Sequence, residues 1–202
     1  MEERSGQARP EVGITPPSRW DTSSVGGLVE IIREDMRANP RGWLVPAKQM
    51  LVVHRLGEWA SDQPWPLRPF ALFAFRLLNV YVRNFLGFEV DRTTRIGRRV
   101  VFVHQNGVVL QPNSEIGDDC MIYHNVTVGR RWEDHRPDSF REPPRIGRGV
   151  HLGVGVTVIG AVSIGDGAKV GPHAVVTTDV PAGASVVAPA SRVLRLRGED
   201  AG

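Results

Sequence analysis

The sequence lacks the features of an exported or membrane-spanning protein. Its 202 residues contain a single cysteine, Cys120, which excludes an intramolecular disulfide and a thiolate-rich zinc site and is typical of a reducing compartment. The first seven residues carry no apolar core of the kind that a signal peptide needs. The longest apolar region, residues 67–88, is interrupted by arginine, proline and asparagine, which argues against a transmembrane helix. We therefore expect a cytoplasmic protein.

Lysine is almost absent, because the chain has 23 arginines and only 2 lysines. The net charge is +3 and the basic residues are scattered rather than clustered, so we expect no nucleic-acid partner. The length suits one medium domain with an appendage. Glycine, by contrast, is abundant at 22 residues, which predicts a fold rich in turns.

The N-terminal half divides into two segments. Residues 1–24 combine prolines, small polar residues and almost no hydrophobic periodicity, which predicts a disordered tail. Residues 25–89 show apolar residues at three-to-four spacing, which predicts a helical N-terminal region. Its last helix, Pro69 to Leu86, is apolar on most sides and needs a cover. We expect packing against the fold or another subunit, with contact to a membrane surface as the less expected alternative.

After Val90 a branched aliphatic or aromatic residue returns every six positions, often followed by glycine. The positions are Val90, Ile96 and Phe102, then Leu110, Ile116, Ile122 and Val128, then Ile146, Leu152, Val158, Ile164, Val170 and Val176. A period of six is the hexapeptide repeat of a parallel β-helix. The sequence thus predicts a mostly β fold, a left-handed parallel β-helix over residues 90–180 behind an α-helical cap. Residues 181–202 form a C-terminal segment, and exposed small and apolar faces predict a homotrimer.

Two irregularities interrupt the repeat, and irregularities in a solenoid are common places for function. One is a polar loop over residues 130–145. The other is the unit from Phe102 to Val109, which has eight residues and places His104 in a bulged corner. The imidazole of His104 suits a general base at neutral pH, or it hydrogen-bonds the loop; position alone leaves both readings open.

Several motifs resemble those of the serine O-acetyltransferases, over about residues 30–194. They are Gly87-Phe88-Glu89-Val90, Ile96-Gly97-Arg98-Arg99, His104, Ile116-Gly117-Asp118-Asp119, Val126-Thr127-Val128-Gly129 and Ile164-Gly165-Asp166-Gly167-Ala168-Lys169-Val170-Gly171. Two further runs are similar to the bacterial exopolysaccharide (colanic-acid type) O-acetyltransferase branch, namely Arg33-Glu34-Asp35-Met36-Arg37-Ala38-Asn39 and Asn125-Val126-Thr127-Val128-Gly129-Arg130.

The resemblance implies an acetyltransferase that uses acetyl-CoA as co-substrate and no metal. It makes His104 the general base that takes a proton from the acceptor hydroxyl, and Glu89 the carboxylate that holds His104. A carboxylate on one imidazole nitrogen fixes the tautomer and raises its basicity. The acceptor oxygen would attack the thioester directly, without a covalent enzyme intermediate.

Three departures from the family pattern concern the acceptor. Family members that bind serine have an aspartate, an Arg-His pair and a second aspartate where this chain has Val103, Glu142-Pro143 and Asn39. A zwitterionic amino acid needs charged partners, so their loss favours a sugar or another hydroxyl metabolite as acceptor. Serine itself, as in cysteine biosynthesis, remains the alternative.

Further site residues follow from position and resemblance. His124 and Trp132 are candidates for lining the acceptor site, although each could equally be a surface residue. The CoA-binding candidates are Gly153, Gly155, Lys169, Gly171, Ala188 and Arg192. The glycines would admit the pantetheine arm, and the cations would bind its phosphates.

Two other classes of function compete. A γ-carbonic-anhydrase-like zinc enzyme uses the same fold, but its His-x4-His spacing is missing among the six histidines. A non-enzymatic trimeric scaffold stays open because the acceptor anchors are absent; it would neither bind acetyl-CoA nor release CoA.

Overall fold

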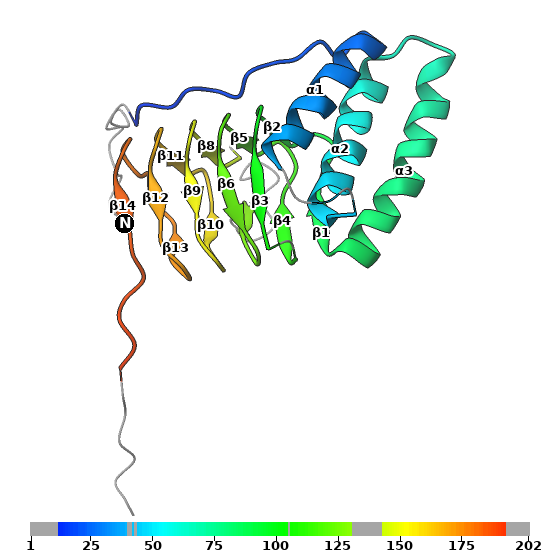
Figure 1. Cartoon of the computed structure of the whole chain (residues 1–202). Coiled ribbons are helices and arrows are strands. Elements are labelled where there is room, and N and C mark those ends of the chain that lie inside the picture. The colour runs from blue at the N-terminus through cyan, green and yellow to red at the C-terminus, as the bar shows by residue number, and fades with distance from the viewer. Residues whose placement is uncertain (1–11, 40–41, 43, 105, 131–142, 193–202) are drawn as a thin grey trace, which may run out of the picture.

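The computed structural model describes residues 12–39, 42, 44–104, 106–130 and 143–192. Three helices form a cap at one end of the molecule, α1 (Val25–Ala38), α2 (Pro46–Asp62) and α3 (Leu67–Leu86), as Figure 1 shows. Ser24 caps α1 by accepting a hydrogen bond from the amide of Gly27, and Pro46 occupies the first turn of α2. Gly87 ends α3 in the left-handed conformation and leads the chain into the first strand.

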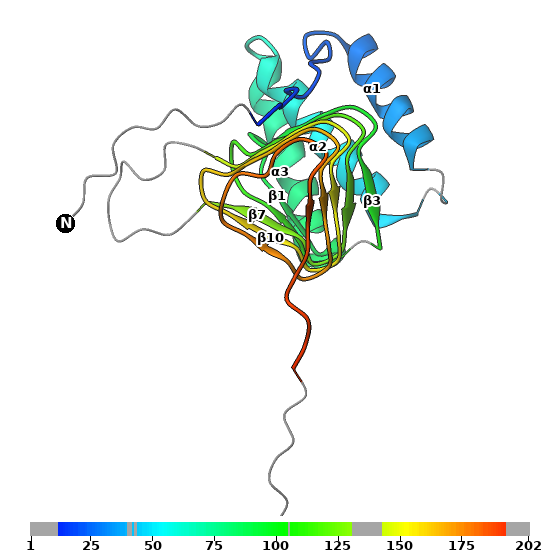
Figure 2. The same ribbon diagram turned by 90° about the vertical axis from the view of Figure 1, so that its left-hand side faces the viewer.

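Short parallel strands follow and wind into a solenoid of triangular cross-section (Figure 2). One face contains β1 (Phe88–Val90), β4 (Val108–Leu110), β7 (Thr127–Gly129), β10 (Thr157–Ile159) and β13 (Val175–Val176). The second contains β2 (Arg95–Ile96), β5 (Glu115–Ile116), β8 (Arg145–Ile146) and β11 (Ser163–Ile164). The third contains β3 (Val101–Val103), β6 (Met121–Tyr123), β9 (His151–Leu152), β12 (Lys169–Val170) and β14 (Ser185–Val186).

The six-residue ladder fills the interior of this solenoid. Ile96, Ile116, Ile146 and Ile164 stack in register on the second face, and all are at most 3% exposed. The ladder positions on the other two faces are buried as well. The predicted fold class, a left-handed parallel β-helix with an N-terminal helical cap, is therefore confirmed.

A buried ion pair joins the cap to the first coil. The guanidinium of Arg55, fully buried in α2, donates to the carboxylate of Asp35 in α1 and to Glu58. It also donates to the backbone carbonyls of Ile96 and Gly97. Burial favours the neutral guanidine, but the two carboxylates outweigh it and raise the pKa of Arg55. One side chain thus ties two helices to the solenoid.

Residues 12–24 correct the expectation of a disordered tail in the part of it that the structure describes. This strap runs along one corner of the solenoid (Figure 1), where Thr15 and Ser18 each bind an aspartate through both backbone amide and hydroxyl, namely Asp166 and Asp118 respectively. Low hydrophobicity does not prevent order here, because carboxylates rather than apolar contacts hold the strap.

The distance between Thr15 and Ser18 in the strap matches the distance between the two aspartates that they bind. Asp118 and Asp166 follow β5 and β11, which flank β8 in their sheet and so lie two coils apart, about 9.6 Å at the usual strand spacing. Thr15 and Ser18 are separated by Pro16 and Pro17, and three residues of polyproline geometry span about 9 Å. The two prolines therefore hold the two hydroxyl residues at the spacing of alternate coils.

We predict that Arg55→Leu lowers the free energy of unfolding by about 3–5 kcal/mol, because it leaves the Asp35 carboxylate buried without its cation. Chemical denaturation measures the loss. The matched control is Arg95→Leu, which removes an exposed ion pair to Glu115 and should cost at most about 1 kcal/mol. Equal losses for the two variants would contradict the role assigned to Arg55.

Candidate active site

His104 lies at the end of β3, in the eight-residue unit, with its side chain exposed. Its backbone is left-handed, at φ 54°, which is uncommon for a residue other than glycine. Such a conformation persists only where the surrounding structure imposes it. The eight-residue unit thus holds His104 in this backbone conformation with its imidazole exposed to solvent.

Two aromatic side chains of the next coil lie beside His104. The ring of His124 stands edge-on to it with centroids 6.0 Å apart, and the ring of Tyr123 lies 6.4 Å away. The Nδ1 atom of His124 is buried and has no hydrogen-bond partner in the part of the chain that the structure describes. The structure therefore brings His104 and His124 together.

Glu89 does not meet His104 within one chain. It projects outward from β1, directly below Val109 of the next coil, and is exposed. No hydrogen bond or ion pair joins its carboxylate to His104 among the described residues. The expected dyad is consequently absent from the isolated chain.

The carboxylate of Glu89 instead lines a cavity of about 160 Å³ between α3 and the first face of the solenoid. Asp91, Arg83, Asn79 and Gln111 line the same cavity. The sequence did not single out these four groups. Asp91 directly follows β1, two residues after Glu89, and alternate residues of an extended chain point to the same side.

Asn39, one of the three positions that lack the family's charged anchors, is a structural link. It is 4% exposed, and its carboxamide nitrogen donates to the carbonyls of Asp35 and Val100 while its oxygen accepts from the amide of Phe102. A carboxamide supplies both donor and acceptor, so it satisfies the strand backbone on its own. Asn39 thereby fixes β3, the strand that ends just before His104.

The other acceptor candidates are dispersed. Val103 is half-buried next to His104 and pairs in register with Tyr123. Pro143 precedes β8, on another face of the solenoid, and is half-buried. Trp132 lies outside the described residues. Of the acceptor candidates that the structure describes, only Val103 and His124 lie beside His104.

Two of the CoA candidates, Gly153 and Gly171, lie in the same row of stacked residues as Tyr123. Continuing the pairing of β6, β9 and β12 by one residue places Gly153 and then Gly171 above Tyr123. A Cβ atom at Gly153 would lie 2.9 Å from the backbone of Val170 and Pro172, so this position admits only glycine. The result is a stretch of this row without side chains between Tyr123 and Val187.

The remaining CoA candidates border this row or lie beyond it. Gly155 occupies the corner after β9, and Lys169 is exposed on β12. Ala188 packs against the end of the core. Arg192 is exposed on the segment that leaves the solenoid after β14 (Figure 1).

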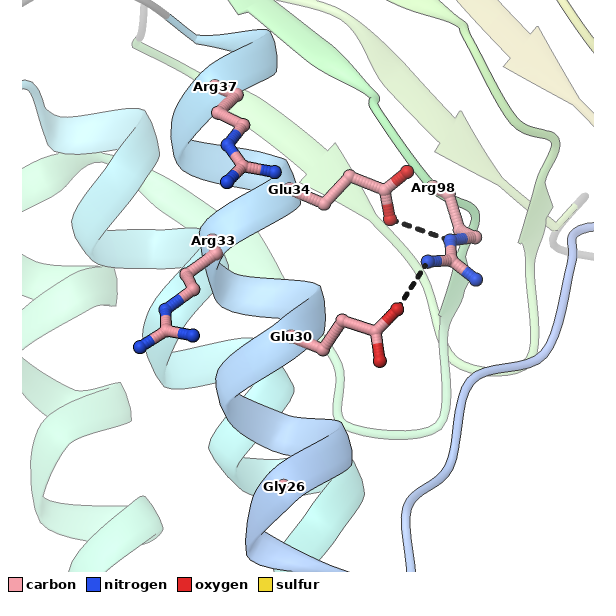
Figure 3. A pocket seen from close by; sticks show the side chains of 6 residues that line it. All are labelled: Gly26, Glu30, Arg33, Glu34, Arg37 and Arg98. Carbon is pink, nitrogen blue, oxygen red and sulfur yellow. Dashed lines mark hydrogen bonds and ion pairs between the residues drawn. The ribbon is translucent and has the colours of Figure 1, made fainter.

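A separate cavity of about 510 Å³ lies between α1 and the solenoid. Figure 3 shows Arg98 reaching across it to Glu30 and Glu34, whose carboxylates neutralise its charge. Arg33 and Arg37 project from the same helix. Neither His104 nor Glu89 lines this cavity, so it is not the candidate active site.

Other chemistries find little support in the described residues. Burial raises the pKa of the Cys120 thiol to about 12, which makes it a poor nucleophile. No cluster of three or more histidine, cysteine or acidic side chains suited to a metal ion occurs in the described ranges. Likewise, no described helix is long and apolar enough to cross a membrane.

Comparison with known proteins identifies the fold and its relatives. The family described as "Bacterial transferase hexapeptide (six repeats)" matches residues 143–178. A serine acetyltransferase of Helicobacter pylori is 32% identical over 164 residues, covering 79% of this chain and 90% of that protein. A putative colanic acid biosynthesis acetyltransferase of Escherichia coli is 34% identical over 165 residues, covering 79% and 96%.

Other relatives are longer. The chain spans only 57% of a Synechococcus elongatus serine acetyltransferase, with which it is 33% identical over 149 residues. The soybean serine acetyltransferase apoenzyme has a TM-score of 0.63 at 29% identity, covering 83% of this chain and 69% of that structure. Near-complete coverage of two relatives above 30% identity places the chain in the serine acetyltransferase-like family of hexapeptide-repeat acyltransferases.

Proposed function

We propose that the protein is an acetyl-CoA-dependent O-acetyltransferase whose acceptor is a saccharide or another hydroxyl-bearing metabolite. The observation that carries the proposal is the position of His104, exposed in its bulge beside His124 and at the end of the face that continues to Gly153 and Gly171. A base and a surface suited to an extended thioester therefore adjoin one another.

In this mechanism His104 accepts the proton of the acceptor hydroxyl. The acceptor oxygen then attacks the carbonyl carbon of acetyl-CoA, a C–O bond forms, and the C–S bond breaks. The imidazolium returns the proton to the departing CoA thiolate, which restores the base. His124 lines the acceptor side, where its ring stands against His104.

Acetyl-CoA lies along the third face in this proposal. The row from Tyr123 through Gly153 and Gly171 offers backbone groups without intervening side chains, which suits an extended pantetheine arm. Lys169 and Arg192 are the candidate cations for the phosphates. A Brucella abortus serine acetyltransferase has been solved in complex with coenzyme A, which supports this co-substrate for the fold.

We propose further that Glu89 orients His104 across a subunit contact in a homotrimer. Within one chain the two side chains make no contact, and the cavity beside Glu89 is open to solvent at the surface of the solenoid. A neighbouring subunit could insert its exposed His104 there. The homotrimer would thus complete the site as well as cover the solenoid faces.

The alternative acceptor is serine, and one observation favours it. The cavity beside Glu89 contains both signs of charge, from Asp91 and Arg83, and a zwitterion needs both. Against it stand Val103 and Pro143, which are apolar, and Asn39, whose carboxamide is already bonded to backbone. We therefore place serine second.

We predict that His104→Ala lowers kcat by about 10²–10⁴ while leaving acetyl-CoA binding and Tm nearly unchanged, because the side chain is exposed and supplies only proton transfer. Release of CoA, followed with a thiol reagent, measures the rate. The matched control is His173→Ala, an exposed histidine with the same left-handed backbone at φ 57°. Wild-type turnover by His104→Ala would show that the base lies elsewhere.

The cross-subunit role of Glu89 predicts rescue in mixed trimers. Glu89→Gln alone should lower kcat by less than His104→Ala, because Glu89 orients the base without transferring the proton. Co-expression with His104→Ala should restore about a quarter of the wild-type sites, since random assembly pairs two intact residues at that frequency. Activity of the mixed trimers no higher than that of the two variants expressed alone would place Glu89 and His104 of one site in the same chain. A larger loss of kcat in Asp91→Asn than in Glu89→Gln would assign the orientation of His104 to Asp91.

Acceptor choice gives a further prediction. L-serine should be acetylated with a kcat/KM at least about 10²-fold below that of the best hydroxyl acceptor, because its charges lack partners. L-cysteine should not inhibit for the same reason. A screen of serine, homoserine, monosaccharides and nucleotide sugars decides the matter. Efficient serine acetylation that Arg83→Ala abolishes would establish the alternative.

A further inference from the structure

The outward side of α3 is apolar although it is exposed. The helix packs on α2 and β1 through Ala71, Phe75 and Val82. Its opposite side, which we name the outer face of α3, consists of Phe70, Phe73, Leu77, Leu78, Val80, Tyr81 and Phe85. Each of these is at least 43% exposed. Contiguous apolar surfaces of this kind mark interaction sites.

The spacing of these residues forms one stripe. Phe70, Phe73, Leu77 and Val80 recur at intervals of three and four, which keeps them on one side along the length of the helix. Trp65, 83% exposed, is a further apolar residue two positions before the helix begins. Figure 1 shows α3 at the end of the molecule opposite β14, where the rest of the described chain does not cover it.

The charges on α3 have one sign. The helix contains Arg68, Arg76 and Arg83 and neither aspartate nor glutamate. In the described part of the chain none of these three guanidiniums pairs with a carboxylate, whereas Arg55, Arg98 and Arg99 do. Unneutralised arginines beside an apolar face complement a partner that is itself anionic and apolar.

We propose that the outer face of α3 docks on the surface of an anionic lipid bilayer, with the helix in the plane of the interface. The aromatic and aliphatic side chains would enter the boundary between headgroups and acyl chains, and Arg68 and Arg76 would contact lipid phosphates. Because no described helix can cross a membrane, the attachment is peripheral.

A second copy of the chain fits this face less well. Two-fold pairing of α3 with itself would align the same arginines along one seam, where like charges repel and no carboxylate of the helix compensates them. In the proposed trimer, by contrast, a three-fold axis places all three copies of α3 at the same end. Three weak anchors on one surface bind more tightly than one.

Sedimentation with vesicles tests the proposal on the full-length protein. Wild type should bind vesicles of phosphatidylcholine with phosphatidylglycerol, bind less at high salt, and bind weakly to phosphatidylcholine alone. The variant Phe73→Ser/Leu77→Ser should lose binding by about tenfold or more, because two apolar anchors are removed. Arg68→Gln and Arg76→Gln should each weaken binding about fivefold.

The matched control is Val25→Ser, which removes an apolar side chain of α1 that is 63% exposed, like the 62% of Phe73. Its vesicle binding should equal that of wild type.

Analytical ultracentrifugation without lipid tests the alternative, in which a second copy of the chain covers the outer face of α3. A smaller assembly for Phe73→Ser/Leu77→Ser than for wild type would show that a second copy covers the face. That result, or failure of wild type to bind phosphatidylglycerol vesicles, overturns the proposal. Acetyl transfer to a soluble acceptor stays independent of lipid and reports separately on the proposed function.

Discussion

The stacking of parallel coils in register is the constraint on which the rest of the molecule depends. Each coil donates backbone hydrogen bonds to the next, and the isoleucine ladder of the second face fixes which residue lies above which. The register of the coils then arranges the outward-facing residues in rows, without any need for contacts between their side chains. The row of Tyr123, Gly153 and Gly171 and the charged row of Arg95, Glu115 and Arg145 both arise in this way.

The periodicity of the sequence predicts both the core and the eight-residue unit that contains His104, because both are local properties of a repeat. His104 could be found since two extra residues disturb a six-residue period. The position of Glu89 relative to His104 could not, because spacing along the chain does not say whether two residues meet within one chain or between copies. Asn39 shows another limit: its burial depends on strand amides more than sixty residues away.

Charge divides the molecule into two regions. Where the cap meets the solenoid, arginine and acidic residues neutralise one another, as in the contacts of Arg98 and Arg99 with Glu34 and of Arg99 with Asp119. The hydrogen bonds that Arg99 donates to Asp119 and Glu34 keep the pKa of its guanidinium well above its usual range, so this junction stays charged throughout the physiological pH range. On α3 the arginines have no such partners among the residues that the structure describes. The contrast separates a surface used for folding from one left for another molecule.

The strap of residues 12–24 has a consequence for cooperativity. A solenoid whose repeats contact only their neighbours frays from its open end, one repeat at a time. Here the backbone of Gly13 accepts a hydrogen bond from Asp166 near the last coils, while Trp20 donates to Glu58 in the cap. The same short segment is therefore hydrogen-bonded to both ends of the molecule. Fraying of the terminal coil must also release contacts to the helices, so the strap joins the two ends of a one-dimensional array into a single unfolding unit.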